Sequence, residues 1–485
     1  MKRLLILAFV PVGVLLAALA LRTMLFSSRQ VRVESVPVIG SPQAAQRLAG
    51  AVRIPTITYE DSVDGSRDAF LTLHAYLEQE YPRVHHALSR EVVGGYSLLY
   101  TWAGSDPTLA PIILTGHLDV VPVDPGTCEE WIHPPFSGHN DGTYIWGRGS
   151  MDDRFTVIGV LEAVDRLLSA GYRPRRTIYI AFGHDEERGG VQGAAQIAAL
   201  LKQRGVRPAF VLDEGLFIAE GIVPGLQAPV ALIGVGEKGS VSLELSVTVE
   251  GGHSSTPPKD TAIGILSQAL TRLESNPMPP RMSDPVRQLF AFLGPEMGWL
   301  QRLAIANLWL FEPLVRQQLA AKPVTNTLIR TTAAPTILQA GIKENLLPSQ
   351  ANAVINFRIV PGDSVAGVVS YVTERIGDPR VQVRPRSNFS EPSAISDASG
   401  PTFQALQRAI RQVFPGTLVA PSLMVARTDA RHYTELTDNV YRFVPIHAKQ
   451  EDVARFHGVN ERVSIENLAQ GIQFYYQLIK NADDL

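Results

Sequence analysis

Two different patterns of apolar residues follow each other along the chain. In the first part, short runs of consecutive apolar residues, such as PIILT at 111–115 and TIYIAF at 177–182, alternate with stretches in which apolar residues recur every three or four positions. Runs of this kind are typical of strands that are buried on both faces of a parallel sheet, and the intervening spacing is typical of helices. The first pattern therefore predicts an α/β domain with a doubly wound, mainly parallel sheet.

The elements expected from this pattern fall in two blocks of the sequence. Helices are expected at residues 43–52, 65–81, 155–170, 191–204, 401–414 and 464–480, and strands at 96–102, 111–115, 177–182, 209–212 and 442–445. Because both blocks show this pattern, we expect 43–238 and 387–485 to form one domain.

The pattern changes at Ser240, after which apolar and polar residues alternate as far as Val249. A period of two predicts a strand with one exposed face, which is typical of antiparallel sheets. Further strands are expected at 328–331, 352–359 and 381–383, and helices at 261–273 and 365–376. We therefore predict an inserted α+β domain at 239–386, of the lid or dimerisation type. Its helical insertion at 277–323 is expected to pack on the domain; the alternatives are that it lines an apolar substrate channel or touches a membrane.

The N-terminus carries an apolar run at residues 4–21, preceded by Lys2 and Arg3 and followed by Arg22. Eighteen residues are just enough to cross a bilayer, and Ala18-Leu19-Ala20 resembles a signal-peptide cleavage site. We therefore expect residues 1–26 to be a membrane anchor or a cleaved signal peptide, followed by a linker at 27–42. By the positive-inside rule, the body of the protein is expected on the non-cytoplasmic side.

Composition excludes some classes of function. The net charge is −3 and the basic residues are scattered, so nucleic-acid binding is not expected. Cys128 is the only cysteine, which rules out internal disulfides and CxxC metal sites.

Acidic and histidine side chains stand where predicted strands end or predicted helices begin. The side chains in question are those of His117, Asp152, Glu187, Asp213 and His457. Alone, each has an ordinary structural role, such as helix capping. The ligand crevice of an open α/β sheet, however, lies at the carboxyl ends of its strands. Two imidazoles and three carboxylates suit zinc, manganese or cobalt, and five groups are enough for two metal ions that share one carboxylate.

Six motifs in this order resemble those of the co-catalytic dizinc exopeptidase and amidohydrolase family. The motifs are GHLDVVP, GRGSMDDR, HDEERGG, DEG, GGHSSTPP and HGVNERVS. The resemblance extends over residues 43–480. That family includes glutamate carboxypeptidase, aminoacylase, succinyl-diaminopimelate desuccinylase and carboxypeptidase S. The chain is most similar to the branch of carboxypeptidase S and N-acyl-amino-acid hydrolases in its membrane-proximal N-terminus, its lengthened second domain and its GRG and HGVNE sequences.

The resemblance implies a role for each metal-site residue. Asp152 is expected to bridge two divalent metal ions, most simply Zn²⁺, with Mn²⁺ or Co²⁺ as alternatives. His117 and Asp213 then complete one metal site, and Glu187 and His457 complete the other. The implied general base is Glu186, and Asp119 orients the ring of His117.

The resemblance also implies residues that contact the substrate. His253 is expected to stabilise the oxyanion, which requires domain closure or a partner subunit, so a homo-oligomer is possible. Asn345, Arg358 and Arg427 are candidates to hold a substrate carboxylate. Arg154 departs from the family, which usually has lysine there; we expect little change, because the charge is kept.

The implied activity is metal-dependent hydrolysis of an amide bond next to a free carboxylate, in a short peptide or an N-acyl amino acid. One alternative is an amidohydrolase of ureido or carbamoyl groups on the same fold. The other is a binding module without catalysis.

Overall fold

The computed structural model describes residues 2–59 and 64–485, and the side chains of residues 11–59 and 65–485. Helix α1 (Lys2–Leu25) contains the N-terminal apolar run, but the side chains of residues 4–10 in this predicted anchor lie outside the described residues. Within the part of the chain that is described, no helix combines the length and the hydropathy needed to cross a membrane.

The chain divides into two compact units. The first consists of Met1–Val235, Gln288–Leu303 and Ile395–Leu485, and the second of Gly236–Arg287 and Ala304–Ala394.

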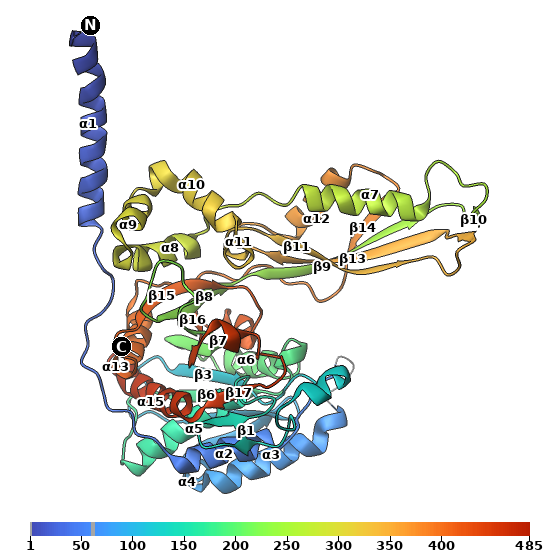
Figure 1. The fold of residues 1–485 in the computed structure, drawn as a ribbon. Coiled ribbons are helices and arrows are strands. Elements are labelled where there is room, and N and C mark those ends of the chain that lie inside the picture. The colour runs from blue at the N-terminus through green and yellow to red at the C-terminus, as the bar shows by residue number, and fades with distance from the viewer. Residues whose placement is uncertain (1, 60–63) are drawn as a thin grey trace. The chain divides into compact units, whose positions relative to one another are not determined.

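An eight-stranded sheet forms the centre of the first unit (Figure 1). Its strands, in spatial order, are β1 (Ser89–Val93), β2 (Ser97–Trp102), β6 (Ile178–Gly183), β3 (Ile112–His117), β7 (Phe210–Ala219), β16 (Val440–Ala448), β8 (Val230–Glu237) and β15 (Leu418–Met424). The four central strands run parallel to one another: β6 pairs with β3, β3 with β7, and β7 with β16. Strands β1 and β2 pair antiparallel on one side, and β8 pairs antiparallel with β16 on the other. The predicted fold class is confirmed.

Helices cover both faces of this sheet because successive strand residues point to opposite sides. On β3, Ile112 and Leu114 belong to one apolar cluster, whereas Ile113 belongs to another. The larger cluster is covered by α2 (Pro42–Val52), α3 (Arg67–Glu80), α4 (Pro82–Ala87), α5 (Arg154–Ser169), α13 (Pro401–Val413) and α15 (Ile465–Ala482). The smaller one is covered by α6 (Ala194–Gln203) and η5 (Asp429–Tyr433).

A small sheet in the first unit joins two motifs that are far apart in the sequence. It consists of β4 (His139–Asn140), β5 (Tyr144–Trp146) and β17 (Arg462–Ser464). Arg462 pairs with Trp146 in this sheet. The segment after His457 therefore lies beside the segment that leads to Asp152. Shorter elements of this unit are η1 (Asp64–Ser66), η2 (Pro125–Glu130), η3 (Glu186–Arg188) and α14 (Gln450–Val453).

The second unit is built on a four-stranded antiparallel sheet (Figure 1). The strands, in order, are β11 (Thr332–Ala340), β13 (Gln350–Ile359), β9 (Gly239–Thr248) and β14 (Val381–Pro385), and helices α7 (Ala262–Ser275) and α12 (Val365–Ile376) cover one face. Val241, Leu243 and Leu245 point to the helices, as their period of two predicts. A separate two-stranded antiparallel sheet pairs β10 (Gly252–His253) with β12 (Leu346–Leu347).

The strand predicted at 328–331 is wrong. Helix α11 (Pro323–Ile329) occupies most of this stretch, and β11 begins only at Thr332. The Nζ atom of buried Lys238 donates hydrogen bonds to the carbonyls of Thr327 and Arg330, at 3.0 and 2.9 Å. These bonds satisfy carbonyls that a helix end leaves unpaired. A lysine almost 90 residues earlier therefore stabilises a helix end that local sequence does not reveal.

The helical insertion predicted at 277–323 does not group entirely with the second unit. It contains α8 (Asp284–Leu293), η4 (Gly294–Glu296), α9 (Trp299–Ala306) and α10 (Leu308–Ala320). The segment Gln288–Leu303 belongs to the first unit. The reason is apolar packing: Phe292 and Leu293 are buried in the larger cluster of the first unit, where the ring of Phe292 lies edge-on to that of Phe403.

Candidate metal centre

Four of the predicted ligands meet in the first unit. His117 ends β3, Asp152 precedes α5, Glu187 lies in η3 and His457 precedes β17. Potential ligand atoms of Asp152, Glu187 and His457 lie within 4.8 Å of one another, and so do those of His117, Glu186 and Glu187. The prediction that strand ends bring these groups together agrees with this geometry.

The carboxylate of Asp152 lies between the two histidines. Its Oδ1 atom is 2.9 Å from Nε2 of His117, and its Oδ2 atom is 3.0 Å from Nε2 of His457. Nε2 of His457 is also 3.4 Å from Oε1 of Glu187. Each oxygen of Asp152 therefore faces a different potential ligand, which is the arrangement that a bridging carboxylate requires.

Asp119 holds two parts of the site in place. Its fully buried carboxylate accepts hydrogen bonds from the backbone N–H groups of Glu186 and Glu187, both at 3.2 Å. Nδ1 of His117 lies 3.3 Å from Oδ1 of the same carboxylate and 3.0 Å from the backbone carbonyl of Asp119. Asp119 thus orients the imidazole and also fixes the turn that carries both glutamates.

Glu461 plays the equivalent part for the Asp152 loop, and the sequence analysis missed this role. Its buried carboxylate accepts hydrogen bonds from the backbone N–H groups of Gly149, Met151 and Asp152, at 3.0, 2.8 and 3.2 Å. Nη1 of Arg148 donates to it at 2.7 Å, and Nη2 of Arg148 donates to the carbonyl of His457 at 3.0 Å. The signal was present, because Glu461 belongs to the HGVNE motif, but the sequence alone does not assign it a partner.

The His457 loop has an uncommon backbone. His457 and Asn460 both lie in the left-handed region, with φ of 59° and 57°. Few residues other than glycine adopt this conformation. The side chain of Asn460 secures the loop, since its Oδ1 accepts from the N–H of Ile132 at 2.7 Å and its Nδ2 donates to the carbonyl of Glu130 at 3.0 Å.

Both histidines favour the protonated form when no metal competes. Burial lowers the pKa of His117, but hydrogen bonds to Asp119 and Asp152 outweigh this and raise it well above its usual value. Hydrogen bonds to Asp152 and then to Glu187 raise the pKa of His457 to about 10. Burial raises the pKa of Asp152, but its hydrogen bonds with His117 and His457 outweigh this effect and lower it.

Glu186 has the environment of an acid–base group. Burial raises its pKa well above the usual value of a glutamate, and the negative charges of Glu187 and Asp429 add to this effect, against the attraction of His117. Glu186 lines a cavity of about 320 Å³ together with Asp152 and His457. The predicted base therefore lines the same cavity as two of the five predicted ligands.

Asp213 is not in either group of potential ligands. The hydroxyl of Thr115 donates a hydrogen bond to its Oδ1, and its buried Oδ2 has no hydrogen-bond partner among the described residues. Its neighbour Glu214 lines the 320 Å³ cavity instead. Burial raises the pKa of Glu214 well above its usual value, and the charge of Asp213 adds to the shift. Glu214 is a second acid that the sequence analysis did not single out, although the DEG motif contains it.

The predicted substrate-contacting residues fall in both units. Arg427 lines the 320 Å³ cavity of the first unit. His253, Asn345 and Arg358 belong to the second unit. There, the N–H of Ser254 donates to the carbonyl of Asn345 at 3.2 Å, which places His253 and Asn345 near each other at the two-stranded sheet of β10 and β12. Arg358 is half-buried in β13, where it pairs with Ser240 and Thr332.

Comparison with known proteins agrees with this geometry. The model of Peptidase family M20/M25/M40 matches residues 113–481. The chain belongs to this family.

Two relatives and one solved structure illustrate the likeness. The chain is 45% identical over 484 residues to a probable carboxypeptidase S-like 2 of Dictyostelium discoideum, covering 97% of this chain and 92% of the relative. It is 43% identical over 444 residues to an N-fatty-acyl-amino acid synthase/hydrolase of Xenopus tropicalis, covering 91% and 86%. An M20 family metallo-carboxypeptidase from Sulfolobus solfataricus has the same fold, with a TM-score of 0.67, 17% identity and coverage of 92% and 100%.

The donor set of this M20 chain fits the metal dependence of its family. Its atoms are imidazole nitrogens and carboxylate oxygens, which suit zinc and related divalent ions. Oδ2 of Asp213 is buried without a hydrogen-bond partner among the described residues, so this oxygen is free to accept a cation. Burial raises the pKa values of Glu187 and Glu214, and the negative charges of Asp152 and Asp213, respectively, add to the shifts.

Arg154, for which the resemblance in the sequence implied a lysine, is buried at the start of α5. Its guanidinium donates to the carbonyl of Leu118 and to the hydroxyl of Thr56. Burial lowers its pKa to about 10. Arg154 thus ties the helix that follows Asp152 to the strand end that carries His117.

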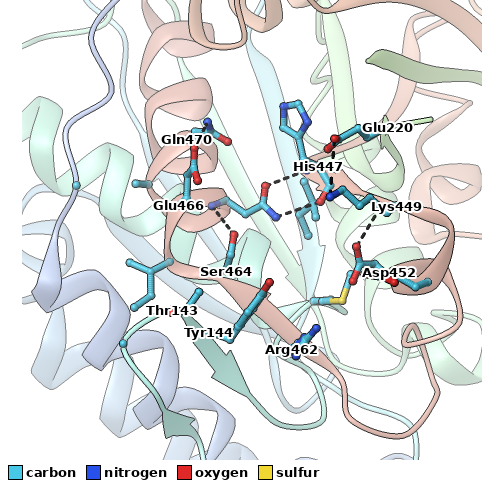
Figure 2. A pocket seen from close by; sticks show the side chains of 18 residues that line it. Thr143, Tyr144, Glu220, His447, Lys449, Asp452, Arg462, Ser464, Glu466 and Gln470 are labelled. Carbon is cyan, nitrogen blue, oxygen red and sulfur yellow. Dashed lines mark hydrogen bonds and ion pairs between the residues drawn. The ribbon is translucent and has the colours of Figure 1, made fainter. Parts of the chain in front are cut away.

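A second cavity in the M20 catalytic unit is larger, about 740 Å³, but it has a different lining. Figure 2 shows it between the start of α15, with Ser464 and Glu466, and the end of β16, with His447 and Lys449. None of the side chains in the two groups of potential ligands lines it. Size alone therefore does not identify the site, because the smaller cavity is the one that Asp152, Glu186 and His457 line.

We expect Glu461→Gln to weaken metal binding and kcat/KM, each about 10- to 100-fold, because the amide nitrogen faces N–H donors where a carboxylate oxygen accepted. Isothermal titration with zinc and steady-state kinetics measure the two effects. The matched control is Glu466→Gln, at an exposed glutamate that accepts a hydrogen bond from Gln470, and this change should leave both values unchanged. Wild-type zinc affinity in Glu461→Gln would contradict the positioning role.

Metal binding should release protons. At neutral pH both His117 and His457 are protonated in the metal-free protein, because their pKa values are raised, to about 10 for His457. A ligating imidazole must lose this proton, so lowering the pH from 8 to 6 should weaken zinc binding by about tenfold per pH unit for each proton released. Titrations in buffers of different ionisation enthalpy count the protons. Affinity that does not depend on pH over this range would disprove the prediction.

Proposed function

We propose that this chain hydrolyses the amide bond next to a free carboxylate, in short peptides or N-acyl amino acids. The observation that carries the proposal is the position of Glu186, a carboxyl of raised pKa that lines one cavity with Asp152 and His457. The two relatives are named as a carboxypeptidase S-like protein and as an N-fatty-acyl-amino acid synthase/hydrolase. Both names imply an amide bond that joins an acyl group to an amino acid with a free carboxylate.

The ligand set that we propose has Asp152 as the bridge between two divalent metal ions, most simply zinc. Its support is that the two oxygens of Asp152 face different histidines. Glu187 and His457 would hold one ion, and His117 and Asp213 the other; the unpaired Oδ2 of Asp213 supports its inclusion. Bound divalent ions supply Lewis-acid polarisation of the scissile carbonyl and a water of lowered pKa.

Glu186 acts as the proton carrier in this proposal. Its carboxylate accepts a proton from the attacking water and delivers it to the leaving nitrogen, so the amine departs as a neutral group. Its turn is held by Asp119 through the backbone N–H groups of Glu186 and Glu187. A raised pKa suits both halves of this task, because the group must hold the proton long enough to transfer it.

His253 is proposed to stabilise the negative charge on the carbonyl oxygen. Its Nδ1 atom accepts a hydrogen bond from the backbone N–H of Ser255 at 3.1 Å. Since a backbone N–H can only donate, the neutral ring carries its proton on Nε2, which is then able to donate to an oxyanion. The proposal requires that His253 be brought to the site by domain closure or by a second copy of the chain.

Asn345, Arg358 and Arg427 are proposed to bind the carboxylate of the substrate. Arg427 has the best support, since it lines the same cavity as Glu186. For a ureido- or carbamoyl-type amidohydrolase we find no supporting observation. Product analysis separates the two, because that class releases ammonia or a carbamoyl product in place of an amino acid.

A non-cytoplasmic, membrane-anchored location stays a prediction from the apolar run at residues 4–21. If it is correct, alkaline extraction should leave the full-length protein in the membrane pellet and should release a variant that lacks residues 1–26. Recovery of both proteins in the supernatant would contradict anchoring.

Glu186→Gln should lower kcat by about 10²- to 10⁴-fold, the usual contribution of a general base, while zinc content stays at the wild-type value. The assay is release of the free amino acid from a panel of N-acyl amino acids and dipeptides. Glu220→Gln, at an exposed glutamate that lines the second cavity, is the control and should keep full activity. If Glu186→Gln keeps wild-type kcat on every substrate, Glu186 is not the base.

A further inference from the structure

The cavity that contains the candidate metal groups has a polar part and an apolar part. Asp152, Glu186 and His457 form the polar part, together with Asp153, Glu214, Arg427 and Thr428. The apolar part is formed by side chains that carry no charge and no hydrogen-bonding group, namely Leu216, Phe217, Met424, Val444, Val453 and Phe456. The cavity volume is about 320 Å³, near the lower limit of the roughly 300–1,000 Å³ that small-molecule sites usually have.

The apolar residues of this cavity come from the same segments of the chain as Glu214 and His457. Leu216 and Phe217 follow Glu214 on β7, and Phe456 directly precedes His457. The rings of Phe217 and Phe456 are stacked, with centroids 5.9 Å apart and an interplanar angle of 19°. This contact joins β7 to the loop of a candidate ligand. Apolar side chains therefore lie close in the sequence to Glu214 and His457 and line the same cavity.

The apolar side chains of the cavity favour binding of a hydrocarbon over binding of a polar group. A polar group placed against these side chains loses hydrogen bonds to water and gains none, whereas a hydrocarbon gains from burial. The two halves of the proposed substrate differ in this respect. The amino-acid half always carries a carboxylate, but the acyl half needs no polar group beyond the scissile carbonyl. The acyl half is thus the half that fits the apolar part.

We propose that the hydrocarbon chain of the acyl group lies in the apolar part of this cavity, and that Phe217, Val453 and Phe456 set the chain length that is accepted. The inference rests on the proposed amide hydrolysis and adds its acyl-chain site. Phe217, Phe456 and Val453 are half-buried, so their side chains still expose surface that a ligand can cover.

The test is a chain-length profile on a series of N-acyl amino acids, from acetyl to oleoyl, with the amino acid held constant. Val453→Trp fills the apolar part and should lower kcat/KM for the long-chain substrates by on the order of 10- to 100-fold, with little effect on the acetyl substrate. Phe217→Leu removes part of the stacked wall and should move the preferred chain to greater length. Thermal unfolding verifies that both variants fold.

Ile465→Trp is the matched control, since Ile465 is a half-buried aliphatic residue that lines the second, charged cavity. Its chain-length profile should equal that of the wild type. A second series varies the amino acid and keeps the acyl group constant. If Val453→Trp changes only this second profile, or lowers kcat/KM equally for all chain lengths, the acyl assignment is overturned.

A binding measurement separates this inference from the proposed function. Oleate and acetate are titrated into the metal-loaded protein and into Val453→Trp. If the wild type hydrolyses no substrate but binds oleate, and Val453→Trp binds it at least tenfold more weakly, the proposed function fails and the apolar site stands. If the wild type hydrolyses acyl amino acids but Val453→Trp changes neither the chain-length profile nor oleate binding, the apolar site fails and the proposed function stands.

Discussion

The structure of the site depends on carboxylates that accept hydrogen bonds from backbone N–H groups. Asp119 binds the turn that carries Glu186 and Glu187, and Glu461 binds the loop that carries Asp152. These two acids are fully buried, and their charge is balanced by N–H groups and by neighbouring cations. Asp153, which lines the cavity, has a similar supporting role, because its Oδ2 atom accepts a hydrogen bond from the backbone N–H of His117 at 3.2 Å. Hydrogen bonds of this kind help several acids to lie at one sheet edge, where repulsion alone would disperse them.

Much of this arrangement could be predicted from the sequence because strand ends are easy to recognise. The consecutive apolar runs before His117 and before Asp185 indicate parallel strands, and parallel strands end on the same edge of the sheet. The general position of Glu187 and His117 follows from this rule. Asp213 and Glu214 mark its limit: the strand expected at 209–212 continues past them as β7 to Ala219, and sequence alone does not decide which of the two carboxylates lines the cavity. The alternation of side chains makes the two directions opposite.

The features that could not be predicted depend on contacts between distant segments. Glu461 and Asp152 are separated by 309 positions, and only the small sheet with β5 and β17 brings their segments together. The end of α11 is stabilised by Lys238, which lies in another part of the second unit, whereas Leu328, Ile329 and Thr331 by themselves favour a strand. Likewise, the allocation of Phe292 to the first unit follows from its burial against Phe403, not from its place between prolines.

The first unit is discontinuous in the sequence, and this has a consequence for biosynthesis. Its central strand β16, its long helix α15 and His457 all come from the last hundred residues, whereas His117 and Asp152 come from the first third. During translation the early strands therefore wait for β16 until residues 440–448 have been made, while the second unit, whose segments precede residue 395, is made in between. The nascent protein cannot close this sheet, or bring His457 to Asp152, before the third segment of the first unit has been synthesised. Such late pairing of distant segments is typical of slow folding.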